Sequence, residues 1–166
     1  MREVDDMTHT EPQDLLSRFW RDLKDLRTGM LGLATEAEGH AQPMTAHFEG
    51  EHGPLWFYAH RQSRIAMAAE QRHPAVFHYV GRKHDLYACV HGEVVLTEDP
   101  RVVQRFWSEE VARWYPQGRN DPDLALLCFS PSSAQIWLPD DGARPTLFGI
   151  GVERETPHEI RAEVRM

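Results

Sequence analysis

The chain has little cysteine, a deficit of basic charge and no long apolar runs. Two of its 166 residues are cysteine, Cys89 and Cys128, and both lie in apolar segments of strand length. This favours buried thiols in a reducing compartment over a disulfide framework. Acidic residues outnumber basic ones by 26 to 18, so the formal charge is −8. Nucleic-acid surfaces need a basic stripe and anionic membranes attract polybasic segments, so neither partner is expected.

Several local signatures of function are also missing. No apolar run approaches membrane-spanning length, and the first ten residues contain no apolar core of a secretory signal. We therefore expect a cytoplasmic protein. The patterns GxGxxG, GxSxG and the P-loop do not occur. The ten histidines are scattered, with no HExxH, and neither cysteine belongs to a CxxC pair, so the sequence predicts no dedicated metal site.

What the sequence does contain is the composition of one folded domain, with 41% hydrophobic and 27% charged residues. Apolar residues at helical spacing predict an amphipathic helix over about 11–27, which would cover one end of a sheet or barrel. Most of the remaining segments have the length and spacing of strands. Strands are expected at about 30–35, 43–49, 55–59, 75–80, 86–96, 124–129 and 134–138, and further helices at about 63–71 and 100–114.

Short strands joined by hairpin-length turns favour an antiparallel barrel or sandwich over a parallel sheet. Gly92, inside the predicted strand 86–96, is expected to mark a bulge or a bend. No repeat or linker divides the chain. We assign residues 1–138 to one domain that includes the N-terminal helix, and residues 139–166 to a C-terminal tail of that domain, which the sequence does not place.

The segment Leu55–Met67 has the pattern of a strand, a polar turn and the start of a helix, with Ser63 as the expected N-cap. A helix start carries free N–H groups and partial positive charge, so it can receive a phosphate, and Arg64 would add a charged fork beside it. A plain helix cap with a solvated arginine explains the same residues. This segment alone leaves both interpretations open.

The sequence Gln42-Pro43-Met44-Thr45 opens the preceding strand. Pro43 removes one backbone donor, and we expect the N–H of Met44 to be the next exposed donor. A strand entry of this kind can present backbone groups to the edge of a flat ligand. A proline at a strand start is also common without any such role.

Together these segments resemble the pyridoxamine 5′-phosphate oxidase-like, FMN-binding split-barrel family, and in particular its bacterial general stress protein branch. The resemblance covers about residues 15–138. The matching segments are PMT at 43–45, LWFYAHRQS at 55–63, LYACVHGEVVL at 86–96, FWSEEVARWYPQGRNDPDLALL at 106–127 and AQIWL at 134–138. The resemblance implies a mainly β fold with flanking helices, a six-stranded antiparallel split barrel, and a homodimer that holds FMN in a cleft between its subunits.

The resemblance also implies roles for individual residues. Ser63 and Arg64 match the family's phosphate-binding pattern, and backbone groups of Met44 and Thr45 would hold the polar edge of the flavin ring. Trp114 and Trp137, with the 115–119 loop, would contact the partner subunit. The other implied cofactor contacts are Gln42, Pro43, Phe57, Tyr58 and Ala59.

Three positions depart from the family pattern. Gln42 replaces an arginine, Ala59 a hydroxyl residue and Ile65 a lysine. Each change removes a polar or cationic contact worth about 1.5–3 kcal/mol when charged. Returning a lysine to position 65 is expected to tighten FMN binding with little effect on folding, because the position begins a helix.

The implied function is an FMN-binding protein of the general stress protein type, acting as a flavin-dependent oxidoreductase on an unknown substrate. No residue is marked as a catalytic acid or base. The tail lacks the Arg-x-His-type motif of true pyridoxamine-phosphate oxidases, so vitamin B6 oxidation is not assigned. The three departures favour an alternative, which is a non-catalytic flavin-binding or flavin-free stress-response dimer. A barrel that holds a deazaflavin or haem is a third interpretation, which no residue selects.

Overall fold

The computed structural model describes residues 12–35, 39–139 and 159–166. The strands are β1 (Thr28–Leu33), β2 (Gln42–Thr45), β3 (Leu55–His60), β4 (His73–Val80), β5 (Tyr87–Thr97), β6 (Leu124–Pro139) and β7 (Glu159–Arg165). The helices are α1 (Pro12–Asp25), α2 (Arg64–Ala69), α3 (Pro100–Phe106), α4 (Glu109–Ala112) and the 3-10 turn η1 (Gly118–Asn120). The part of the predicted tail between β6 and β7 lies outside the described residues.

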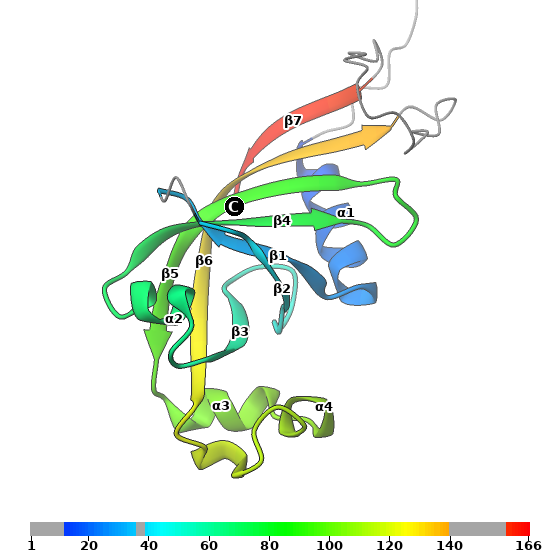
Figure 1. Cartoon of the computed structure of the whole chain (residues 1–166). Helices are drawn as coiled ribbons and strands as arrows, with labels where there is room; N and C mark the ends of the chain where they lie inside the picture. The colour runs from blue at the N-terminus through cyan, green and yellow to red at the C-terminus, as the bar shows by residue number, and fades with distance from the viewer. Residues whose placement is uncertain (1–11, 36–38, 140–158) are drawn as a thin grey trace, which may run out of the picture.

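All the described strands belong to one antiparallel sheet, whose order is β2-β1-β4-β5-β6-β3, with β7 paired to β6. The end strands of this order meet at a bridge between His47 and Trp56, where two backbone hydrogen bonds measure 2.8 and 2.7 Å. The sheet thus curls into a nearly closed barrel (Figure 1). The predicted six-stranded antiparallel barrel with flanking helices is confirmed, and β7 is an addition that the sequence left unplaced.

Strand β6 connects the two ends of the barrel (Figure 1). On one side it pairs with β5 along most of its length; on the other it pairs first with β3 and then with β7. The prediction of two separate strands, 124–129 and 134–138, is wrong because the residues between them also pair with β5.

The register between β5 and β6 shifts between His91 and Gly92, which confirms the predicted irregularity at Gly92. There β5 packs so tightly that a Cβ on Gly92 would lie 2.3 Å from the Ser130 carbonyl oxygen.

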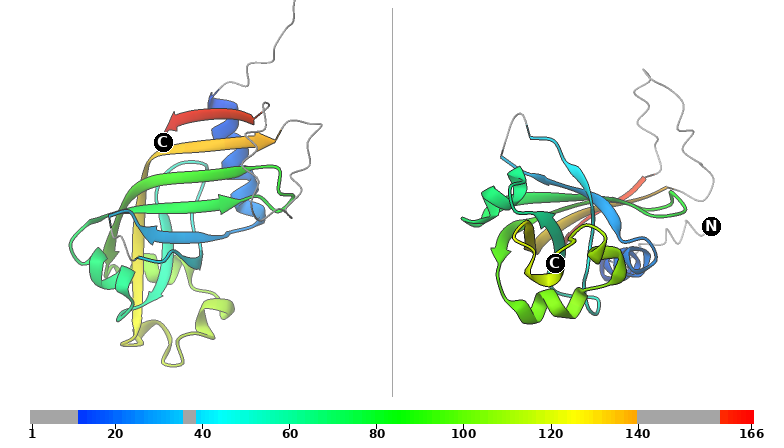
Figure 2. Two further views of the ribbon diagram at one scale, coloured as in Figure 1. Left: turned by 45° about the horizontal axis from the view of Figure 1, so that its top comes forward. Right: turned by 60° about the horizontal axis from the view of Figure 1, so that its bottom comes forward.

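Helix α1 covers one end of the barrel, as the amphipathic pattern predicted (Figure 2). Its buried residues Leu15, Phe19, Trp20 and Leu23 join the main core. The hydroxyl of Tyr79 on β4 donates a hydrogen bond of 2.8 Å to the backbone carbonyl of Asp22, which fixes the helix to the sheet. Burial of this apolar face provides most of the helix's stability.

The second predicted helix, 100–114, is wrong as a single element, because it breaks into α3 and α4. Trp107 has an extended backbone, with ψ of 130°, and Ser108 is the N-cap of α4. The Ser108 hydroxyl accepts a hydrogen bond of 3.3 Å from the Val111 N–H. Two glutamates in the first turn of α4 complement the positive end of its dipole. A serine followed by two glutamates is a helix-start signal in the sequence itself.

Helix α2 begins as predicted, with Ser63 as its N-cap and the Ser63 hydroxyl accepting a hydrogen bond of 3.3 Å from the Ala66 N–H. The environment of residue 65 differs from the one that we expected. Ile65 is 3% exposed and belongs to the main core, whereas Met67, on the opposite face, is 55% exposed. A lysine at position 65 would therefore place its charge in the core. The expectation that a lysine here has little effect on folding assumed an exposed position, and that assumption is wrong.

The two cysteines are free, as predicted in place of a disulfide, and both are half-buried where buried thiols were expected. Burial nevertheless raises the pKa of both thiols. Within the described residues, no helix is long and apolar enough to cross a membrane.

The position of Ile65 generates a stability prediction. Ile65→Lys should lower the free energy of unfolding by on the order of 3 kcal/mol, because it removes a buried apolar side chain and introduces an unpaired charge. Met67→Lys is the matched control, since it adds the same charge to the same helix on its exposed face, and it should change stability by less than about 0.5 kcal/mol. Urea denaturation of the two variants measures the difference. Equal losses would show that Ile65 does not contribute to the core.

Candidate functional site

The barrel opens beside its closing bridge. Beyond His47 and Trp56, no backbone pairing between β2 and β3 occurs within the described residues. Continuing the register of the bridge places Thr45 across from Tyr58, and Pro43 across from His60. The two strands thus face each other across a gap in which neither completes the other's hydrogen bonds.

The register also determines which backbone groups point into the gap. The N–H of Ala46 donates to the Arg27 carbonyl on the β1 side, whereas the N–H of His47 donates to Trp56 on β3. Backbone groups of successive strand residues point to opposite sides. The N–H and C=O of Thr45 therefore point toward β3 and the gap. The N–H of Met44 points to β1, so the expectation that Met44 supplies the exposed donor is wrong by one residue.

Strand β3 presents its backbone to the gap in the same way. Trp56 bonds to His47, and Arg61 donates to the Asp123 carbonyl on the β6 side. The alternation therefore turns the N–H and C=O of Tyr58 toward β2. The gap is bordered on both sides by backbone groups that the sheet does not use.

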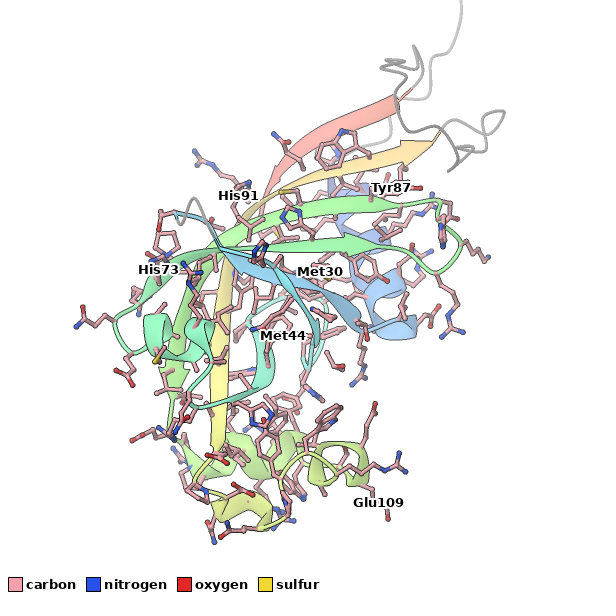
Figure 3. The ribbon with its side chains drawn as sticks, in the orientation of Figure 1. Met30, Met44, His73, Tyr87, His91 and Glu109 are labelled. Atoms are coloured by element: carbon pink, nitrogen blue, oxygen red, sulfur yellow. The ribbon has the colours of Figure 1, made fainter. Side chains whose placement is uncertain are left out.

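This gap forms a pocket of about 400 Å³. Helix α4 and the residues after it line one side of the pocket, and Met44, on β2, belongs to the sheet side (Figure 3). A pocket of this size is in the usual range for small-molecule sites. Its lining residues are Thr28, Gln42, Pro43, Met44, Thr45, His47, Tyr58, Ala59, His60, Ser63, Glu110, Val111, Trp114 and Tyr115.

Aromatic rings form one wall of this pocket. The Tyr58 ring lies 5.3 Å from the His47 ring and 6.4 Å from the Tyr115 ring, between ring centres. The Tyr58 hydroxyl donates a hydrogen bond of 2.7 Å to the Val103 carbonyl, which connects β3 to α3. Burial raises the pKa of both tyrosines to about 12. Both hydroxyls are therefore neutral near pH 7, and the wall is uncharged there.

His47 extends this uncharged wall. Burial lowers the pKa of its imidazole, and the nearby positive charge of Arg27 lowers it further, although Glu110 opposes the shift. A histidine with a lowered pKa is neutral at pH 7. The pocket thus combines backbone donors and acceptors along its edge with a neutral aromatic face, which suits a flat, polar-edged heterocycle.

Most of the residues predicted to contact a cofactor line this pocket. They are Gln42, Pro43, Met44, Thr45, Tyr58, Ala59, Ser63 and Trp114. The structure brings them together from β2, β3 and the cap of α2, which follow one another in the sequence, and from the segment after α4, which comes much later in the chain.

Three predicted residues lie elsewhere. Phe57 is fully buried beside Phe77, because alternate residues of β3 face the core, so it does not flank the pocket. Arg64 begins α2 with an exposed side chain that is not part of the lining. Trp137 pairs with Tyr87 on the sheet, away from the pocket of its own chain, and its contact with a partner subunit stays a prediction.

Six lining residues were not predicted as cofactor contacts: Thr28, His47, His60, Glu110, Val111 and Tyr115. His60 could have been identified from the sequence, because side chains of a strand alternate between its two faces and His60 follows Tyr58 by two residues. Glu110 could not be found in this way, because its position depends on the break between α3 and α4.

A larger groove of about 810 Å³ lies on the other side of the aromatic wall, between α3, η1 and the ends of β5 and β6. Arg61, one of its lining residues, is bonded to the Leu124 carbonyl at 3.1 Å and to Glu98 at 3.4 Å. None of the predicted cofactor residues lines this groove. The smaller pocket is therefore the candidate site. No cluster of three or more histidine, cysteine, aspartate or glutamate side chains within the described residues could hold a metal ion.

Comparisons with known proteins agree with this geometry. Residues 14–154 match the model of the family described as pyridoxamine 5′-phosphate oxidase like. No curated protein matches the chain.

Two solved structures from Xanthomonas are similar along most of their length. A candidate general stress family protein of Xanthomonas campestris pv. campestris is 40% identical, with 86% of this chain and 97% of that chain covered and a TM-score of 0.74. The general stress FMN/FAD binding protein of Xanthomonas citri is 39% identical, with 84% of this chain and 97% of that chain covered and a TM-score of 0.73. A candidate general stress protein 26 of Jannaschia sp. CCS1 is 31% identical, with 78% and 82% covered and a TM-score of 0.70. The chain therefore belongs to the pyridoxamine 5′-phosphate oxidase-like family, and it is similar to that family's general stress proteins.

Proposed function

We propose that this chain binds FMN in the pocket between β2 and β3 and acts as a flavin-dependent oxidoreductase of the general stress protein type. The observation that carries the proposal is the pair of unpaired strand edges at Thr45 and Tyr58, beside a neutral aromatic wall. The similarity to the FMN/FAD binding protein of Xanthomonas citri supports a flavin as the ligand.

The described residues fit the ring of a flavin. An isoalloxazine is flat and carries donors and acceptors along one edge, which matches the backbone N–H and C=O of Thr45. Tyr58 and Trp114 supply flat apolar surface on the sides of the pocket. When bound, the flavin would supply hydride and electron transfer, and the protein would bind it, orient it and limit water around it.

The phosphate end fits less fully. Ser63 lines the pocket and its hydroxyl already caps α2, while Arg64 stands next to it at the start of that helix. Among the described lining residues there is no lysine or arginine. This observation favours the alternative function, a stress-response dimer that has lost flavin or holds it without catalysis.

We also propose a homodimer that completes the pocket. Trp114 lines the pocket while 69% of it is exposed, and Met30 and Val80 on the outer face of the sheet are 40% and 41% exposed. Figure 3 places Met30 with Tyr87 and His91 on the outer side of the sheet, away from Glu109 at the helical end. Exposed aromatic and methionine side chains are enriched in interfaces. A second copy of the chain would cover them and add its own side chains to the cofactor.

The dimer is tested by mass in solution. Light scattering at micromolar concentration should give about twice the 19.2 kDa mass of the chain. Met30→Glu should shift the mass toward the monomer and weaken FMN binding, because it places a charge in the proposed interface. A monomeric wild type that still binds FMN would contradict the shared pocket while leaving flavin binding intact.

The use of the strand edge is tested at position 45. Thr45→Pro removes one N–H that the sheet does not use, and Pro43 already occupies the equivalent place two residues earlier, so folding should be retained. Affinity for both FMN and riboflavin should fall on the order of tenfold, the effect of one lost hydrogen bond. Thr45→Ala keeps the N–H and should bind both ligands like the wild type. Fluorescence titration measures all of these affinities.

Two results would count against this proposal. Equal affinities of Thr45→Pro and Thr45→Ala would show that the Thr45 N–H does not contact the ligand. If the purified wild type shows no flavin absorbance and binds neither FMN nor riboflavin, the flavin-free alternative accounts for this chain.

A further inference from the structure

The groove at the helical end of the barrel has no part in the proposed flavin function. Its volume is about 810 Å³, and it lies between α3, η1 and the ends of β5 and β6 (Figure 1). Tyr58 lines the pocket, and its hydroxyl donates a hydrogen bond of 2.7 Å to the carbonyl of Val103, which lines the groove. No described residue lines both cavities, so a ligand in the groove leaves the pocket open.

The floor of the groove is apolar and well fixed. Val103, Leu124 and Leu126 are buried in the smaller of the two core clusters, and Trp107 packs against them. The Trp107 ring lies 6.1 Å from the Tyr58 ring, between ring centres, which fixes the indole against the wall that the two cavities share. Trp107 is only half-buried, so part of its ring offers a flat apolar surface to a ligand in the groove.

The two carboxylates among the described lining residues are already engaged. Asp121 is buried, and its two oxygens accept hydrogen bonds of 3.0 Å from the backbone N–H groups of Gln117 and Asp123. Glu98 pairs with Arg61 at 3.4 Å, and its side chain is 75% exposed to solvent. The groove therefore has little to offer a cationic ligand.

The two arginines of the groove differ in this respect. Arg61 donates to Glu98 and also to the Leu124 carbonyl. The Arg119 guanidinium lies 5.9 Å from the centre of the Trp107 ring, over its face, and it forms no ion pair with any described residue. A guanidinium that stacks on a ring keeps the N–H groups in its own plane, where their geometry matches a carboxylate. The groove thus places an available cation beside an aromatic face.

We propose that this groove binds a small aromatic carboxylic acid. Its ring packs on Trp107 and the apolar floor, and its carboxylate accepts hydrogen bonds from the guanidinium of Arg119. The apolar floor adds affinity that an inorganic anion cannot gain, and Arg119 adds affinity that an uncharged ring cannot gain. Because the groove and the pocket are lined by different residues, the acid and FMN bind at the same time.

The experiment compares benzoate with benzamide, which has the same ring and no charge. Each is titrated into the protein while backbone amide chemical shifts are followed by NMR. Benzoate should shift the amides of the groove residues Gly118, Arg119 and Asn120, and it should leave the amide of Thr45, in the pocket, unchanged. Benzamide should bind about tenfold more weakly, the effect of one charged contact. Saturating FMN should change neither affinity.

Two arginine variants test the residue assignment. Arg119→Gln should weaken benzoate by about tenfold, to the level of benzamide, and should leave benzamide unchanged. Arg113→Gln is the matched control, because Arg113 is an exposed arginine nearby in the chain that does not line the groove, and it should alter neither affinity. Trp107→Leu should weaken both probes, since both use the ring. The dispersion of the NMR spectrum confirms that each variant is folded.

Several results would overturn this proposal while leaving the flavin function untouched. Equal affinities for benzoate and benzamide, or an Arg119→Gln variant that binds benzoate like the wild type, would show that Arg119 does not bind the carboxylate. Shifts centred on Thr45 that FMN abolishes would place the acid in the flavin pocket. Absence of any shift at millimolar benzoate would show that the groove holds no such ligand.

Discussion

The two backbone hydrogen bonds between His47 and Trp56 determine much of this structure. They close the barrel at one point. They also determine which residues of β2 and β3 turn their backbone N–H and C=O groups toward the opposite strand. Because successive residues point to opposite sides, Thr45 and Tyr58 must turn their backbone groups toward one another. The strands separate before these groups can pair. The pocket is therefore a direct consequence of where the barrel stops closing. Pro43 lies on the same edge of β2 as Thr45, and because proline has no N–H it leaves no unpaired donor there.

The side chains around this opening have complementary properties. Burial holds Tyr58 and Tyr115 in their neutral forms and also favours the neutral form of His47, so the wall is apolar and uncharged. The backbone edge supplies donors and acceptors without any charged side chain. Such a site favours a flat heterocycle with a polar edge over a small anion or a metal ion. It suits chemistry that belongs to a bound cofactor, with the protein controlling orientation and access.

The strands and the N-cap at Ser63 were predictable because local pattern and turn chemistry agree with the final fold. The family resemblance also identified most of the pocket lining. The errors arose where tertiary pairing overrides local pattern. Pairing with β5 makes β6 continuous through residues that look like a turn, and packing of α2 buries Ile65 although it begins a helix. The residue that points its N–H into the gap is Thr45 and not Met44, because the pairing of a strand with its neighbours decides which residues point to which side. No single-sequence pattern contains that information.

Hydrogen exchange of the backbone amides of β2 tests the central claim most directly. The Thr45 N–H faces the opening, whereas the Ala46 N–H bonds to Arg27 on β1. In the free protein, the Thr45 amide should exchange much faster than the Ala46 amide. Saturating FMN should slow exchange at Thr45 by at least about tenfold, since a ligand hydrogen bond protects it, and should change Ala46 little. A Thr45 amide already protected without ligand, or one whose exchange is unchanged by saturating FMN, would contradict the account.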